Sequence, residues 1–314
     1  MNSPLFLGAG IFTPADPAHL ELISPLFELA DFFEISPEMM FTGDSSGRGL
    51  REHPLADLMA DLGPIYGKPY VGHGLHFSLG DAAPGPRRQD WLQLLRRVDE
   101  RFHCLWYTEH SGWTSSGGEH AVLPLPLPHS DEAAELCVTS LRQIQEVFPL
   151  AGVENSVFPF LLGDALGEYA FLQRILDQAE AWLLLDLHNL YTHALNFGVS
   201  CQDLLAQFKL DRVIEIHISG GSVSDPDWLN SRQTFRLDSH DGAVPAEVWT
   251  LLEQVMPLCP NLRGVVLERL HGTLSREEAP GFFAEFARLK EMCDQRKNEM
   301  GTAEGAEGRR SLNL

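Results

Sequence analysis

The chain has 314 residues, 44% of them hydrophobic, which is enough for one large core or two modest ones. Its formal net charge of -21 repels phosphate groups, so we expect no nucleic-acid partner and no binding to anionic membranes. It contains no apolar run long enough to span a membrane and no secretory signal within Met1–Gly10, so we expect a cytoplasmic protein.

Eight apolar segments of strand length follow one another along the chain. Most are apolar throughout rather than alternating, as expected of parallel strands that are buried on both faces. In chain order they are Leu5–Ile11, Phe32–Ser36, Tyr70–Leu75, Leu105–His110, Gly152–Ser156, Trp182–Asn189, Val213–Ser219 and Gly264–Arg269.

Amphipathic segments of helix length separate these strands. The first, Ala18–Ala30, contains Pro25, which predicts a kink or a break. Ser130 and Ser200 stand where N-caps are expected. The other predicted helices are Pro54–Leu62, Gln89–Arg101, Asp131–Val147, Ala165–Gln178, Cys201–Phe208, Ala246–Met256 and Ala279–Lys297.

Alternating strands and helices with a repeat of about 35 residues predict an α/β protein, a (β/α)8 TIM barrel. We expect residues 1–297 to form this single domain and the polar residues 298–314 to form a disordered tail. A doubly wound open sheet is the alternative. It would build its site at one switch point and would not explain polar chemistry at nearly every strand end.

Three connections leave the carboxyl ends of strands, where barrel enzymes place their active sites. Ser111–His129 is rich in glycine and proline, and Gly220–Val244 contains Asp238 and His240. The Gly/Ser-rich segment Phe41–Gly49 has the composition of a mobile lid.

Most of the predicted strands end on His, Glu or Asp, and these ends meet at the mouth of a barrel. A mixed set of imidazoles and carboxylates suits iron, zinc or manganese. Three or four protein ligands complete a mononuclear site, and the candidates exceed that number, so we predict two or three ions. The candidate metal ligands are His73, His110, Glu154, Asp186, His188, Asn189, His217, Asp238, His240 and Glu268.

Two assignments stay open at this point. Strand alternation places His188 on the side of Asp186, whereas Asn189 takes that position if the strand has already turned. His110 either binds metal or supports the site, with Glu109 beside it as an orienting carboxylate. The catalytic candidates that orient a ligand or face the substrate are Glu34, Glu109 and Glu215.

Five cysteines are scattered along the chain without a CxxC pair, which predicts reduced thiols and gives no spacing for a zinc finger. They are Cys104, Cys137, Cys201, Cys259 and Cys293.

The order of the candidate ligands resembles that of the xylose-isomerase-like superfamily, which includes endonuclease IV. More specifically, the chain resembles the multinuclear non-haem iron-dependent oxidative enzymes. The matching pieces span nearly the whole predicted barrel: Gly8-Ala9-Gly10, Phe33-Glu34-Ile35, His73-Gly74, Thr108-Glu109-His110, Leu123-Pro124-Leu125-Pro126, Glu154-Asn155, Leu185-Asp186-Leu187-His188-Asn189, Asn196-Phe197-Gly198, Glu215-Ile216-His217-Ile218-Ser219-Gly220, Asp238-Ser239-His240 and Leu267-Glu268.

This resemblance implies two or three iron ions (Fe2+/Fe3+) and oxygen-dependent oxidation of cysteine in a ribosomally made precursor peptide. It also implies a partner protein that delivers the peptide. Many relatives carry Asn where this chain has His188, which is a departure from the pattern. The ligands it implies are His73, His110, Glu154, Asp186, Asn189, His217, Asp238, His240 and Glu268.

Other functions remain as alternatives. A metal-dependent sugar isomerase or epimerase of the same superfamily usually adds a catalytic lysine, and none of the four lysines stands at a strand end. A phosphodiesterase like endonuclease IV is disfavoured by the negative charge. A barrel without catalytic activity, serving as a binding module, would keep its metal content unchanged when Glu154, Asp186 or His217 is replaced.

Overall fold

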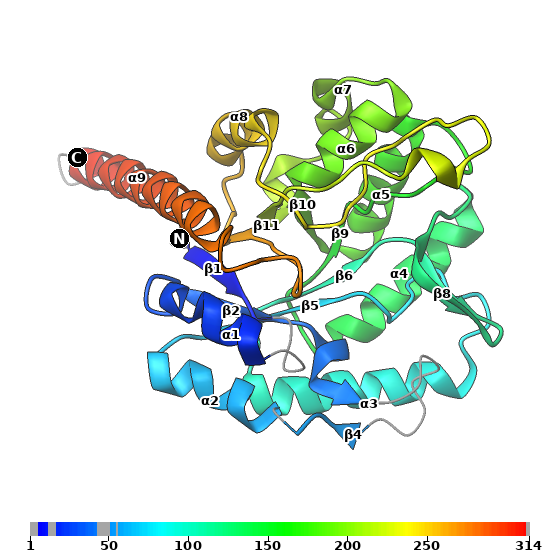
Figure 1. Ribbon diagram of the computed structural model, residues 1–314, viewed down its shortest axis with the longest axis horizontal. Helices are drawn as coiled ribbons and strands as arrows, with labels where there is room; N and C mark the ends of the chain where they lie inside the picture. Colours follow the sequence, from blue (N-terminus) through cyan, green and yellow to red (C-terminus); the bar gives the residue numbers. More distant parts are fainter. Residues whose placement is uncertain (1–5, 12–16, 43–50, 55, 312–314) are drawn as a thin grey trace.

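The computed structural model describes residues 6–11, 17–42, 51–54 and 56–311, and it contains a closed barrel of eight parallel strands (Figure 1). The predicted (β/α)8 fold is therefore confirmed. Around the barrel the strands lie in the order β1-β12-β11-β10-β9-β6-β5-β2. They are β1 (Phe6–Gly10), β2 (Phe32–Ile35), β5 (Tyr70–Gly74), β6 (Tyr107–His110), β9 (Ala151–Glu154), β10 (Trp182–Asp186), β11 (Val213–Ile218) and β12 (Gly264–Leu267).

Helices surround the barrel (Figure 1). The N-caps predicted at Ser130 and Ser200 accept backbone N–H groups three residues ahead, and the predicted break at Pro25 falls in a short 3-10 turn, η1 (Ser24–Leu26). The helices are α1 (Pro17–Ile23), α2 (Ala56–Tyr66), α3 (Gly85–Phe102), α4 (Asp131–Gln145), α5 (Ala165–Ala179), α6 (Leu187–Phe197), α7 (Cys201–Leu205), α8 (Ala246–Val255) and α9 (Ala279–Ser311). Within the described residues, no helix is long and apolar enough to cross a membrane.

The strand predicted over Trp182–Asn189 is too long. β10 ends at Asp186, and α6 starts at the next residue because the Asp186 carboxylate caps it, accepting the backbone N–H of Asn189 at 2.6 Å. Gly198 ends α6 in the left-handed conformation, with φ of 67°. His188 and Asn189 therefore lie in the first turn of a helix that the sequence analysis did not predict.

Two other segments differ from expectation. The connection Ser111–His129 contains a hairpin, β7 (Trp113–Ser116) and β8 (Glu119–Leu125), which turns at Gly117 and Gly118 with positive φ. Helix α9 continues to Ser311, although disorder was predicted from residue 298.

The segment predicted as a lid, Phe41–Gly49, is described only at its start. Phe41–Thr42 forms β3, which pairs antiparallel with β4 (Arg51–Glu52). Residues 43–50 lie outside the described residues, so the lid stays a prediction.

An apolar floor fills the lower interior of the barrel. Five side chains from different parts of the wall form a cluster separate from the larger core between strands and helices: Phe32, Val71, Trp106, Ile214 and Val266. The rings of Phe32 and Trp106 meet edge to face, with centroids 5.3 Å apart. At Gly264 an added Cβ would lie 2.9 Å from both rings, so this wall position has room only for glycine.

A polar layer lies above this floor, because the next inward-facing residues of the strands are polar. Alternate residues of a strand share a face, and the residues two positions after Phe32, Val71 and Val266 are Glu34, His73 and Glu268. On β11 the register shift opposite Leu183 and Leu184 lets the neighbours Ile214 and Glu215 both face inward, and His217 shares the face of Glu215 by alternation. The fold thus brings acidic and imidazole side chains together at one end of the barrel.

Candidate metal centre

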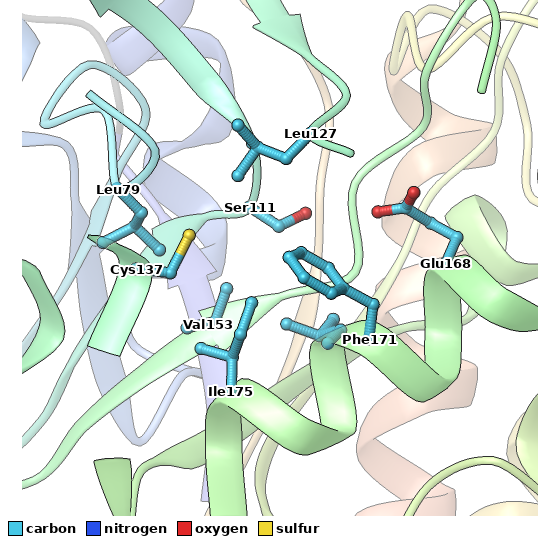
Figure 2. Close-up of a pocket in the computed structure, with 10 residues that line it drawn as sticks. Leu79, Ser111, Leu127, Cys137, Val153, Glu168, Phe171 and Ile175 are labelled. Atoms are coloured by element: carbon cyan, nitrogen blue, oxygen red, sulfur yellow. The ribbon is translucent and has the colours of Figure 1, made fainter. Parts of the chain in front are cut away.

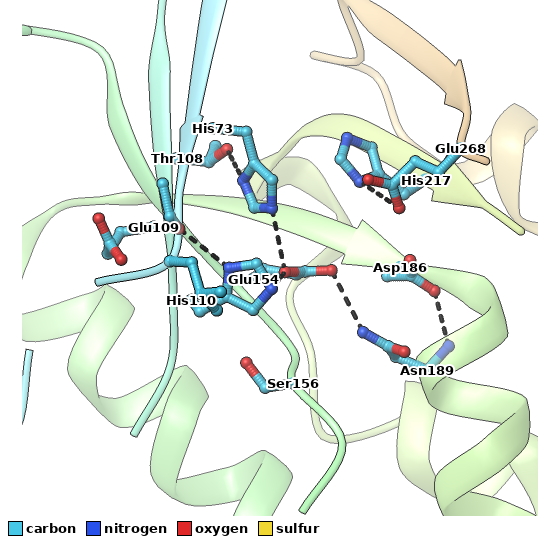
Figure 3. Close-up of polar contacts among 12 residues, drawn as sticks. His73, Thr108, Glu109, His110, Glu154, Ser156, Asp186, Asn189, His217 and Glu268 are labelled. Carbon is cyan, nitrogen blue, oxygen red and sulfur yellow. Dashed lines mark hydrogen bonds and ion pairs between the residues drawn. The ribbon is translucent and has the colours of Figure 1, made fainter. Parts of the chain in front are cut away.

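The predicted ligands converge at the carboxyl end of the barrel, and Figure 3 shows those other than His188, Asp238 and His240. They come from the ends of β5, β6, β9, β10 and β11, from the first turn of α6, from the connection after β11 and from the residue after β12. Among the described residues there are three groups of side chains in which the ligand atoms of the group lie within 4.8 Å of one another. These groups are His73–Glu154–His217, Asp186–His240–Glu268 and Glu34–Glu215–His217.

Glu154 contacts the other residues in one part of the site. Its Oε2 lies 2.9 Å from His110 Nε2 and 3.3 Å from His73 Nε2, and its Oε1 accepts a hydrogen bond from Asn189 Nδ2 at 3.2 Å. The far nitrogens of both imidazoles are held as well. His73 Nδ1 lies 2.9 Å from Thr108 Oγ1, and His110 Nδ1 lies 2.9 Å from the Gly74 carbonyl.

Glu268 joins the other part of the site. Its Oε2 lies 3.1 Å from His217 Nδ1 and 3.6 Å from His240 Nε2. Asp238 Oδ1 lies 2.6 Å from the same nitrogen of His240. Asp186 reaches this group from β10, so residues far apart in the sequence surround one small volume.

Two buried oxygens in this volume test whether a cation fits. Asp186 Oδ2 and Asn189 Oδ1 have no hydrogen-bond partner among the described residues. A buried polar atom without a partner costs free energy, and in native proteins it usually has an explanation. A metal ion bound between these oxygens and the facing donors would be such an explanation. The mixed set of nitrogen and oxygen donors fits iron, zinc or manganese.

The charges of the site also favour a bound cation. Burial and the neighbouring carboxylates of Glu154, Asp238 and Glu268 raise the pKa of Asp186 well above its usual value. Although burial opposes ionisation, His217 and His240 outweigh it and lower the pKa of Glu268 to about 2. Crowded carboxylates are stabilised by positive charge, which here comes from imidazolium groups when no metal is bound.

Two of the three predicted catalytic carboxylates lie beneath the site. Glu34 Oε2 is 3.1 Å from His217 Nε2, and Glu215 Oε1 is 3.8 Å from it. The indole N–H of Trp106 donates to Glu215 Oε2 at 2.7 Å, which ties this pair to the apolar floor. Burial raises the pKa of Glu34 to about 8. One nitrogen of His217 thus faces the candidate ligands while the other faces these carboxylates, the arrangement that orients metal-binding histidines.

The third, Glu109, points away from the candidate ligands (Figure 3). It accepts hydrogen bonds from the Tyr107 hydroxyl at 2.7 Å and from the backbone N–H of Phe77, and burial raises its pKa to about 8. The expected contact with His110 is absent because neighbouring residues of β6 face opposite sides of the barrel wall. The sequence analysis missed Thr108, which strand alternation already places on the same side as His110.

His188 and Asn189 take different positions in the first turn of α6. Asn189 contacts Glu154 and turns an unpaired oxygen into the site. His188 lies farther out, with its Nδ1 4.0 Å from Asp238 Oδ1. Both are fully buried, and burial lowers the pKa of His188 to about 4. Of the two, Asn189 is the better placed to bind metal.

The site opens to solvent along one edge. The side chains of His110, Asp238 and His240 keep 16%, 21% and 20% of their surface exposed, whereas His73 and Glu154 keep 7% and 2%. Solvent therefore reaches the site at the side chains of His110, Asp238 and His240.

A separate small cavity lies behind this site, between the barrel wall and helices α4 and α5 (Figure 2). Val153 and Ser111, neighbours of Glu154 and His110, line it together with Cys137 and Glu168. Its volume of about 10 Å³ is at the lower limit for one water molecule. It is therefore too small for a substrate.

Comparison with known proteins assigns the chain to a family. A sequence model described as "RiPP precursor modification enzyme MbnB/TglH/ChrH", where RiPP denotes a ribosomally synthesised and post-translationally modified peptide, matches residues 16–292. The chain belongs to this family. Its family is thus one of enzymes that modify precursor peptides, and the resemblance stated from the motifs is confirmed.

Individual relatives agree with this assignment. The chain is 29% identical to a UPF0276 protein of Caulobacter vibrioides over 248 residues, which is 78% of this chain and 80% of the relative. It is 31% identical to a UPF0276 protein of Neisseria meningitidis serogroup C over 204 residues, 64% of this chain and 69% of the relative.

Solved structures share the fold. Endonuclease IV from Thermus thermophilus superposes with a TM-score of 0.52 at 15% identity, covering 93% of this chain and 99% of that one. A xylose isomerase-like TIM barrel protein from Mycobacterium smegmatis in complex with magnesium gives 0.56 at 12% identity, with the same coverage. At such low identity these similarities establish the TIM-barrel fold and nothing about the reaction.

Proposed function

We propose that this family member is a multinuclear iron-dependent oxidase or oxygenase that uses O2 to modify cysteine in a ribosomally made precursor peptide. The observation that carries the proposal is the continuous cluster of donors around Glu154 and Glu268, which exceeds what a single ion uses. We expect the protein to act in the cytoplasm, with a second protein that presents the peptide.

Two adjoining sets of side chains would hold the ions. By their contacts, His73, His110 and Asn189 gather around Glu154, and Asp186, His217, Asp238 and His240 gather around Glu268. Nitrogen and oxygen donors in this proportion support iron, which the motif resemblance also implies. Iron would supply the redox chemistry that no side chain here provides and a position at which a soft thiolate can bind.

The protein's own groups orient and enclose the reaction. Glu34 accepts the Nε2 proton of His217, with the Glu215 carboxylate 3.8 Å from the same nitrogen, which keeps Nδ1 directed toward Glu268. The apolar floor excludes water from below. A cysteine side chain would reach the ions from the exposed side of His110 and His240.

The test is anaerobic purification followed by metal analysis, Mössbauer spectroscopy of iron-loaded protein and oxygen consumption with a cysteine-containing precursor peptide. We expect at least two iron ions per chain and oxygen uptake that stops when serine replaces cysteine in the peptide. Zinc as the sole bound metal, or turnover that does not depend on iron, would refute the proposal.

The alternative of a sugar isomerase or epimerase finds little support in the site. Each of the four lysines contacts a group away from the barrel mouth: Lys68 the Glu28 carbonyl, Lys209 Asp177, Lys290 Asp294, and Lys297 Asp31. Isomerisation of a sugar with Mn2+ or Mg2+ under strict exclusion of oxygen is the result that would support this alternative.

A further inference from the structure

Helix α6 holds the connection that carries Asp238 and His240, and it does so through Asn196. The Oδ1 of Asn196 accepts the backbone N–H of Arg236 at 2.8 Å, and its Nδ2 donates to the Arg236 carbonyl at 3.0 Å. One side chain thus satisfies both backbone groups of one residue, as a neighbouring strand would. Since an amide has one donor end and one acceptor end, this pairing fixes its orientation.

The side chain of Arg236 then returns to α6. Its Nη2 donates to the Gly221 carbonyl at 2.8 Å and lies 3.3 Å from His188 Nε2, and its guanidinium lies over the Tyr191 ring. The approach to Gly221 is close, because a Cβ there would lie 2.8 Å from His188 Cε1. These contacts join the start of the connection and the residues just before Asp238 to α6.

The contact with Arg236 decides the tautomer of His188. Arginine only donates hydrogen bonds, so His188 Nε2 must accept, and the ring hydrogen is then on Nδ1. That nitrogen has no hydrogen-bond partner among the described residues and faces Asp238 Oδ1 at 4.0 Å. Neither nitrogen of His188 keeps a free lone pair directed at the candidate ligands.

We infer that His188, Arg236 and Asn196 are positioning residues that aim Asp238 and His240 at the metal centre, and that His188 is not a ligand. The inference rests on the proposed metal site for its function, but the contacts themselves need no metal. It explains why His188, although next to Asn189 in the sequence, does not bind metal.

The first experiment uses the metal-free protein. Hydrogen exchange of the segment around Arg236, followed by mass spectrometry, should accelerate about tenfold or more in Asn196→Ala and Arg236→Gln. Asn261→Ala, which removes a surface contact with the Asp211 carbonyl, is the matched control and should leave this segment unchanged. Equal exchange in wild type and both variants would overturn the inference, whatever metal the protein binds.

The second experiment asks whether His188 binds metal. Co2+ titration by calorimetry should show the same number of ions in His188→Phe and wild type, with about 10- to 100-fold weaker binding at the class of site that His240→Ala abolishes. His193→Phe replaces another buried histidine of α6, one that packs on Tyr169 and Phe197, and should bind Co2+ like wild type.

Paramagnetic NMR of the Co2+-loaded protein separates the two roles of His188. All imidazole N–H resonances with the large contact shifts of metal-bound rings should persist in His188→Phe, because the Nδ1–H of an unbound His188 has no bonded path to the ion. Loss of one such resonance would make His188 a ligand and overturn the inference. Absence of iron-dependent oxygen use would refute the proposed function and leave both readouts intact.

Discussion

Glu154 contacts residues of other elements with both of its carboxylate oxygens. It contacts His73, His110 and Asn189, and these three reach it from β5, β6 and α6. Although burial opposes ionisation, His110 and His73 lower the pKa of Glu154 well below its usual value. The carboxylate therefore stays charged at neutral pH.

Replacing Glu154 with Gln should remove metal without unfolding the barrel, because the amide keeps the size of the side chain and loses its charge. We expect at least a tenfold loss of metal affinity, measured by titration of the stripped protein. Glu168→Gln is the control: Glu168 is also buried and bonded to a histidine, His129, but lies outside the site. Equal metal loss in both variants would contradict the role assigned to Glu154.

At the scale of elements, α6 was the main feature hidden from sequence reasoning. Eight strands were visible as apolar runs, because burial on both faces leaves a strong signal. The start of α6 was not visible, because Leu187 and Leu190 continue the apolar run Trp182–Leu185. Only Asp186, His188 and Asn189 interrupt this run. Those three were interpreted as ligands, and one of them is also an N-cap.

The sequence predicted some parts of the site better than others. Residues at the ends of strands were placed correctly, because parallel strands bring their carboxyl ends to one edge. The contacts made by Glu109 and Arg236 were not predictable, because the path of a connection and its return contacts depend on tertiary packing. Thr108 could have been found from alternation alone.

Asp186 has two roles that substitution can separate. Asn caps helices about as well as Asp but carries no charge, so Asp186→Asn should keep the stability of the metal-free protein and lower metal affinity. Asp186→Ala should lose both, with about 1 kcal/mol of unfolding free energy removed with the cap. Urea denaturation of stripped protein and metal titration measure the two effects. Identical behaviour of the two variants in both measurements would show that the roles are not separate.

At the scale of the whole molecule, the apolar floor connects stability to the site. Phe32 and Trp106 pack over Gly264, and Trp106 also holds Glu215 beneath His217. A disturbance of the floor therefore reaches the metal centre through one hydrogen bond.

Gly264→Ala tests this connection. The added methyl group has no room between the two rings, so we expect a loss of about 1–3 kcal/mol in the free energy of unfolding, measured by urea denaturation. Gly281→Ala on α9, where nothing lies near the added atom, should not destabilise the protein. A destabilised Gly281 variant beside an unaffected Gly264 variant would contradict the packing described for the floor.

Metal removal should lower the stability of the whole barrel, because acidic groups then repel one another in the site and in a chain of net charge -21. With free metal at 100 times its dissociation constant, the loaded protein should be about 2.7 kcal/mol more stable than the stripped one. Calorimetry with and without chelator measures the difference. Restoration by sodium chloride alone would indicate screening rather than a specific site.

The floor also gives the barrel the form of a cup instead of a tube. Since Phe32, Trp106 and their neighbours close one end, a chain cannot be threaded through the interior. It can only present a terminus, a tight bend or a single side chain at the rim, and it must withdraw by the path it entered. The residue chosen for modification is then decided by what protrudes from the peptide as much as by the sequence around it.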